Sequence, residues 1–198
     1  MKKRFAFILL ILLSLSKLNA QGDIQVALPI ITGSLFSFNQ YYDSTSISDI
    51  NPTICIKKTD FFEDNKIGIY ESLAFSKKNT ISVFHFFEGE TGIKLAVGPV
   101  YKFNEKDNYY MVIGSGPQVT FFKDQMYLGV EIDFQTRFSP KKQFSPVVGV
   151  CSDINLFNMK IPSRFSSTDD TNNNSDLTAI FYLNVGFQGY IALSINFD

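Results

Sequence analysis

Apolar and polar residues alternate along the segment from Met126 to Phe138. Every second position is mostly apolar, and the positions between include Glu131, Asp133 and Arg137. Because successive side chains of a β-strand point to opposite faces, this period of two predicts a strand with one apolar and one ionised face. In a soluble sheet the apolar face would turn inward, whereas in a membrane barrel it would face lipid.

Seven further segments repeat the pattern with varying clarity. The clearest is the C-terminal one, in which Phe181, Leu183 and Val185 begin an apolar face that continues to Phe197. Together with the first segment they predict an all-β chain of eight strands. The seven segments are residues 23–33, 51–59, 66–76, 91–103, 108–122, 146–157 and 179–197.

The connections between these strands differ in length on the two sides of the predicted sheet. Those after the second, fourth and sixth strands are short, whereas Ser37–Ser48, Lys77–Glu90 and Asn158–Asp176 are longer. Short turns on one side and longer loops on the other are typical of outer-membrane barrels, in which closure leaves no strand edge unpaired in lipid. We therefore predict an eight-stranded antiparallel up-and-down transmembrane β-barrel, with Thr80–Glu90 as a candidate extra strand.

The N-terminus has the layout of a secretory signal peptide. Lys2, Lys3 and Arg4 precede an apolar run from Phe5 to Leu13, which is shorter than the ~20 residues that a spanning helix needs. Cleavage after Ala20 would leave residues 21–198 as a single barrel domain. No later segment is long and apolar enough to be a transmembrane helix.

Composition narrows the class of partner. The formal net charge of -1 excludes a broad nucleic-acid footprint. The chain has 21 Phe and no Trp, and aromatic residues gather near predicted strand ends, where they would form the interfacial girdles of a barrel. These residues are Phe36, Phe38, Phe61, Phe62, Tyr101, Phe103, Tyr109, Tyr110, Phe121, Phe122, Phe138 and Phe144.

The polar faces of the predicted strands combine small residues with a few charges of both signs, as a narrow lumen requires. In a dry interior these charges must satisfy each other, so we expect a salt-bridged plug that fixes strand register. A gate or narrow ion path is the functional alternative. The predicted lumenal polar cluster comprises Lys57, Lys94, Lys102, Glu131, Asp133, Arg137, Asp153 and Gln188.

Cys55 and Cys151 both fall on the inward parity of their strands and would lie in an oxidising compartment. Their strands are not neighbours in the predicted order, which favours two buried thiols over a disulfide and leaves the bridge open as an alternative. No metal site is expected, because no His or second Cys lies near either thiol in the sequence.

The single histidine, His85, lies in a predicted aromatic loop with Phe84, Phe86 and Phe87. We expect this loop to be the best place for an adhesive or apolar-ligand contact. The sequence contains no nucleophile elbow, zinc-protease motif or glycine-rich phosphate loop, so we predict neither enzyme activity nor a cofactor.

The C-terminal strand ends with Phe197, one residue before the end of the sequence, and resembles the assembly signal of bacterial outer-membrane proteins; Asp198 departs from a strictly terminal Phe. Over its whole mature length the chain resembles the small outer-membrane barrels typified by OmpX, OmpW and the OmpA membrane domain. The resemblance implies location in the outer membrane, a plugged or very narrow interior, and lipid and the assembly machinery as partners.

A barrel hosts many functions, so the role must come from its loops or its lumen. We expect a structural or surface-interaction role, in which the longer loops contact a host or surface ligand. One alternative is a narrow channel for small or apolar solutes. The other is a secreted, soluble, lipocalin-like barrel with its apolar face inward.

Overall fold

The structure is a computed structural model that describes residues 21–39, 50–62, 66–78, 90–122, 125–160 and 179–197. All regular structure in these ranges is β-strand. Among the described residues, no helix is long and apolar enough to cross a membrane. The strands are β1 (Gln21–Asn39), β2 (Ile50–Phe61), β3 (Ile67–Lys78), β4 (Glu90–Lys106), β5 (Tyr109–Phe121), β6 (Gln125–Phe138), β7 (Phe144–Lys160) and β8 (Ala179–Phe197).

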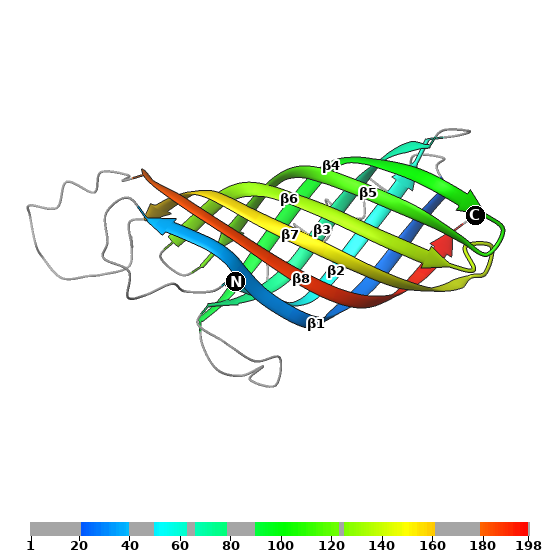
Figure 1. Cartoon of the computed structure of the whole chain (residues 1–198), viewed down its shortest axis with the longest axis horizontal. Helices are drawn as coiled ribbons and strands as arrows, with labels where there is room; N and C mark the ends of the chain where they lie inside the picture. Colours follow the sequence, from blue (N-terminus) through cyan, green and yellow to red (C-terminus); the bar gives the residue numbers. More distant parts are fainter. Residues whose placement is uncertain are drawn as a thin grey trace, which may run out of the picture.

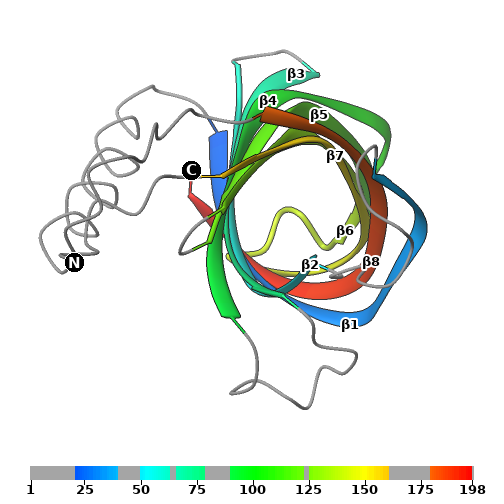
Figure 2. The same ribbon diagram turned by 90° about the vertical axis from the view of Figure 1, so that its left-hand side faces the viewer.

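Each strand pairs with the next one in an antiparallel ladder, and β8 pairs with β1, so the sheet closes on itself. Figure 1 shows the strands running obliquely along the barrel. Figure 2 shows the same strands as a ring, viewed along the barrel axis. This topology confirms the predicted eight-stranded up-and-down barrel. We call the end that carries the connections β2–β3, β4–β5 and β6–β7 the turn end, and the opposite end the loop end.

Several strands are longer than their sequence pattern predicted. The β1–β8 ladder runs from the pair Gly22 and Phe197 to the pair Asn39 and Tyr182, so β1 continues well past the predicted limit of residue 33. The predicted loops 37–48, 77–90 and 158–176 therefore overlap the ends of β1, β3, β4 and β7. These loop boundaries were wrong because ladder pairing maintains a strand beyond the point where its apolar alternation fades.

The ladder between β1 and β2 is the shortest in the barrel. It joins Gln21–Ala27 to Cys55–Phe61 and stops there, although both strands continue. Pro29 in β1 and Pro52 in β2 lie just beyond this point, and a proline has no N–H to donate to a ladder. The barrel therefore has a seam at its loop end, where β1 pairs with β8 and β2 pairs with β3.

Burial decides which face of the strands looks inward. The exposed positions hold large apolar side chains, such as Ile30 at 54% and Leu193 at 50% exposure, whereas Glu131 at 0% and Arg137 at 1% are enclosed. A soluble barrel would show the reverse distribution. The apolar outer wall and charged interior are those of a transmembrane β-barrel, the class that bacterial outer membranes contain, and they contradict the lipocalin-like alternative.

The aromatic residues near strand ends divide between the two faces. Five of them are exposed on the outer wall, namely Phe62, Tyr101, Phe121, Phe138 and Phe144. For three others the girdle prediction was wrong. Phe61, Tyr110 and Phe122 are buried inside, because they share the inward parity of their strands, and they make edge-on ring contacts there. Phe103 and Tyr109 are half-buried. The side chains of Phe36 and Phe38 are not among those that the structure describes.

A charge placed on the outer wall tests its contact with lipid. Ile132 is exposed near the middle of β6, and we expect Ile132→Arg to destabilise the folded barrel in bilayers by about 2–4 kcal/mol. At the turn end of the same strand, the control Phe138→Arg should cost about 0–1 kcal/mol. Urea titration of folding into phosphatidylcholine vesicles measures both, and equal costs would contradict a lipid-facing wall.

Candidate functional site

The predicted lumenal residues lie on the inner wall of the barrel or at its mouth. Most are almost fully enclosed, while Asp153 and Lys102 keep some contact with the exterior, at 13% and 17% side-chain exposure. Lys102 lies at the turn-end mouth. The enclosed residues are Lys57, Lys94, Glu131, Asp133, Arg137 and Gln188.

Strand β6 supplies the largest share of the inner charges. Glu131, Asp133, Gln135 and Arg137 occupy alternate positions, so the two-residue period of the strand sets all of them on one face. Glycines on the inner faces of other strands leave the room that these side chains and their partners require. At Gly149, for example, an added Cβ would overlap the hydroxyl group of Tyr190.

In the middle of the lumen, an ammonium group joins two opposite walls. Lys57 Nζ on β2 lies 2.8 Å from Asp133 Oδ1 on β6, and β2 and β6 are half a turn of the barrel apart. The Tyr190 hydroxyl donates to the same carboxylate oxygen at 2.8 Å, and Lys57 Nζ lies 4.6 Å from the centre of the Tyr190 ring. Glu131 Oε1 is a more distant partner at 3.9 Å.

A second ammonium group joins three strands. Lys94 Nζ on β4 lies 2.7 Å from Glu131 Oε2 on β6 and 2.8 Å from Asp153 Oδ1 on β7. Glu131, Asp153 and Cys151 offer ligand atoms within 4.8 Å of one another, a spacing that could hold a metal ion. The Lys94 ammonium already supplies a cation to both carboxylates, so the donor set is that of a buried salt bridge.

The third contact lies toward the turn end. Arg137 Nη1 lies 2.6 Å from Asp23 Oδ1 on β1 and donates to the Tyr110 hydroxyl at 3.0 Å, while Nη2 donates to Thr59 Oγ1 at 2.9 Å. Gln25 donates to the Asp23 carboxylate at 2.8 Å, and Ser194 donates to it as well. One guanidinium thus ties β6 to β1, β2 and β5, which is the multi-donor role that suits arginine.

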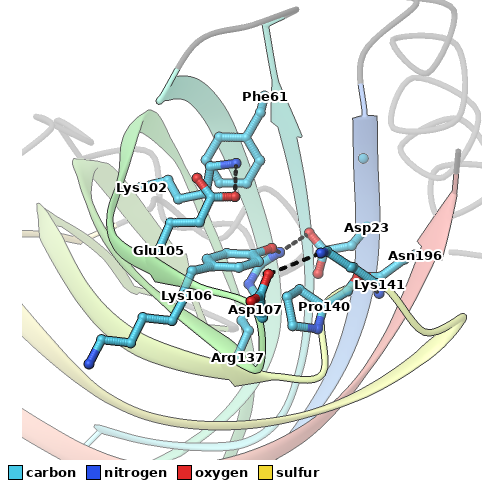
Figure 3. Close-up of a pocket in the computed structure, with 12 residues that line it drawn as sticks. Asp23, Phe61, Lys102, Glu105, Lys106, Asp107, Arg137, Pro140, Lys141 and Asn196 are labelled. Carbon is cyan, nitrogen blue, oxygen red and sulfur yellow. Dashed lines mark hydrogen bonds and ion pairs between the residues drawn. The ribbon is translucent and has the colours of Figure 1, made fainter.

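Outside this contact the lumen widens into a cavity of about 720 Å³ at the turn end. Figure 3 shows Arg137, Asp23 and Phe61 at this cavity, with Lys102 and Lys106 from β4 and Lys141 from the connection between β6 and β7 around it. Lys102 Nζ lies 3.4 Å from the Glu105 carboxylate, and Lys141 Nζ lies 3.3 Å from the Asp107 carboxylate. The cavity is therefore a vestibule that ends on the Arg137–Asp23 pair.

Both cysteines are free and buried. Cys55 Sγ lies 3.2 Å from Ser72 Oγ, and Cys151 Sγ lies 3.9 Å from Asp153 Oδ1. The two side chains nevertheless belong to one buried apolar cluster with Ala27 and Tyr190, so the lumen is narrow enough to bring β2 and β7 into the same packing group.

Some predicted residues lie outside the described part of the chain. These are Phe84, His85, Phe86 and Phe87, together with most of the candidate extra strand Thr80–Glu90, of which Glu90 begins β4. Phe197 is the last residue of β8 and pairs with Gly22 of β1. Sequence reasoning missed Asp23, Thr59 and Tyr110 as members of the network, although the inward parity of each strand could have indicated them.

Comparisons with solved structures find remote matches. Neisserial surface protein A matches with a TM-score of 0.45 and 9% identity, covering 90% of this chain and 96% of that chain. Ail, the attachment invasion locus protein of Yersinia pestis, matches with 0.40 and 12%, covering 90% and 100%. Ail in a phospholipid bilayer nanodisc matches with 0.38 and 13%, covering 86% and 99%. No family model and no curated protein matches the chain.

These likenesses are remote, and the architecture follows from the strand pairing of this chain itself. What its interior can do is also set by its own contacts. Three cationic side chains each hold carboxylates on other strands at 2.6–2.8 Å, across the space that a solute would have to cross. Such an arrangement braces the wall of the barrel.

Removing Lys94 tests the brace. We expect Lys94→Met to lower the free energy of unfolding by about 3–5 kcal/mol, because the enclosed Glu131 and the largely buried Asp153 lose their shared cation. Adding Glu131→Gln to the same chain should recover part of this loss, because one of the two charges is then gone. Urea-dependent migration of the folded band on gels measures both variants, and a double variant no more stable than Lys94→Met would contradict the role assigned to Glu131.

Proposed function

We propose that the protein is a non-enzymatic outer-membrane barrel with a closed lumen, which serves as a rigid platform for the segments at its loop end. The observation that carries the proposal is the set of ion pairs that crosses the lumen, Lys57–Asp133, Lys94–Glu131 and Arg137–Asp23. A lumen filled in this way leaves the loop-end segments as the parts that can meet other molecules.

The strand topology supports this division of roles. Residues 40–49, 79–89 and 161–178 connect strand ends at the loop end, whereas the turn end carries shorter connections. Long segments displayed by a rigid scaffold are a common location for binding sites. We therefore assign to the loop end a contact with a host or surface ligand of the adhesion type, including the aromatic segment around His85.

The alternative is a narrow channel for small or apolar solutes, and the vestibule at the turn end is the feature that favours it. That vestibule ends on Arg137, whose side chain is only 1% exposed and is held by partners on three other strands. A solute entering from the turn end would have to break these contacts. The closed platform is the better supported of the two.

Conductance separates the platform from the channel. We expect the wild-type protein to produce no discrete current steps in planar lipid bilayers, because the paired side chains fill the lumen. A variant with Lys94→Ser, Glu131→Ser and Asp153→Ser removes the crossing contacts of Lys94 together with both carboxylates that this lysine holds, and it should increase ion leakage. Regular conductance steps from the wild-type protein would contradict the closed platform.

Replacement of a loop-end segment tests the display role. We expect a chain in which residues 161–178 are replaced by a short Gly-Ser linker to fold as the wild type does, with the same heat-modifiable band, because the ladder between β7 and β8 is retained. Adherence to host cells of bacteria that carry each chain measures the effect. A matched linker in place of the turn residues 140–142 should leave adherence intact, and equal adherence of all chains would contradict the role.

A further inference from the structure

Three ionisable side chains interrupt the apolar outer wall on β2 and β3. Lys58 and Asp60 alternate with the inward residues Lys57 and Thr59, and Glu71 lies opposite Lys58 in the β2–β3 ladder. Lys58 Nζ donates to Asp60 Oδ2 at 2.6 Å. The Asp60 carboxylate lies over the backbone of Gly22, where an added Cβ would be only 2.5 Å from Asp60 Oδ1. We call Lys58, Asp60 and Glu71 the outer-wall triad.

The triad lies between apolar residues of the same wall. On β2, Ile54 and Ile56 are exposed on the loop-end side of the triad. On β3, Ile67 and Ile69 are exposed on the turn-end side of Glu71. Charged groups at this position therefore face the bilayer. They lie a few residues from the turn end, and each residue of a strand adds about 3.3 Å along its length. The triad is therefore close enough to contact the headgroups of the leaflet at the turn end.

The charges of the triad do not balance. One ammonium group faces two carboxylates, and Lys58 is bonded to Asp60. Oε2 of Glu71 has no hydrogen-bond partner among the described residues and is covered by neighbouring protein atoms, whereas the Glu71 side chain as a whole is only half-buried, so a rotation of the carboxylate turns it toward the headgroups. A carboxylate in this setting needs a donor, and a positively charged donor makes the stronger hydrogen bond.

From this arrangement we propose that the outer-wall triad binds the headgroup of a phospholipid that carries a primary ammonium, as phosphatidylethanolamine does. The ammonium donates to Glu71, and the phosphate accepts from Lys58, whose ammonium has three donor hydrogens and uses one on Asp60. Phosphatidylcholine carries the same charges, but its methylated nitrogen has no hydrogen to donate. The site should therefore select the first lipid over the second.

The absence of Trp from the chain allows a local reporter of lipid identity. Ile69→Trp places an indole on the outer wall, two residues from Glu71 on the same face of β3. The protein is reconstituted in phosphatidylcholine vesicles that contain either brominated phosphatidylethanolamine or brominated phosphatidylcholine as a quencher. We expect the ethanolamine lipid to associate about twofold to fivefold more strongly at this reporter, as for one partly exposed ion contact.

Two controls accompany the reporter. Ile132→Trp places an indole on the outer wall of β6, away from the triad, and should be quenched equally by the two lipids. Quenching there also shows that the outer wall contacts lipid, so a failure of the site is distinguishable from a failure of the barrel to enter the membrane, and neither result bears on the closed lumen, which conductance tests. Glu105→Gln makes the same chemical change as Glu71→Gln at an exposed turn-end position.

In the Ile69→Trp background, Glu71→Gln should reduce to one the ratio of the association of the ethanolamine lipid to that of the choline lipid. Glu105→Gln should leave this ratio unchanged. The heat-modifiable band verifies that each variant is folded. Equal quenching by the two lipids at the Ile69→Trp reporter would overturn the proposal and would indicate that a proton or a membrane protein satisfies Glu71. A preference that persists in Glu71→Gln would overturn it as well.

Discussion

The ion pairs that cross the lumen connect strands that share no backbone hydrogen bonds. Lys57 joins β2 to β6, Lys94 joins β4 to β6 and β7, and Arg137 joins β6 to β1 and β2. Ladders bind each strand only to its two neighbours, so these contacts add cross-bracing to the ring. They are enclosed by the same wall that they brace, which excludes the water that would weaken them.

The inverted distribution of residues follows from the solvent on each side of the wall. Hydrocarbon outside offers no hydrogen bonds, so the outer positions hold Val, Leu, Ile and Phe, and polar side chains gather inside. The interior of an eight-stranded barrel is only wide enough for side chains, which explains why both polar and apolar groups pack there. The buried cluster of Ala27, Cys55, Cys151 and Tyr190 fills the space that the charged groups leave.

Much of the fold could be predicted from the sequence, because a period of two reports directly which residues share a face. The number of strands and the shared face of Glu131, Asp133 and Arg137 follow from this period, whereas the strand order and the inward direction of that face also required the lengths of the connections and the composition of the polar faces. Partners across the lumen do not, because they depend on the stagger of the closed ladder, which the sequence pattern does not contain. The rings of Phe61, Tyr110 and Phe122 were misassigned because their position near a strand end was weighed above their parity.

The seam between β1 and β2 has a consequence for how the ring forms and opens. Their ladder is limited to the stretch from Gln21 to Ala27, whereas β1 and β8 pair over most of β1, although those two strands are farthest apart in the sequence. Separating β1 from β2 therefore breaks fewer hydrogen bonds than separating β1 from β8. The weakest join in the cylinder is thus between neighbours in the chain, and the two terminal strands would travel together as one ribbon when it parts.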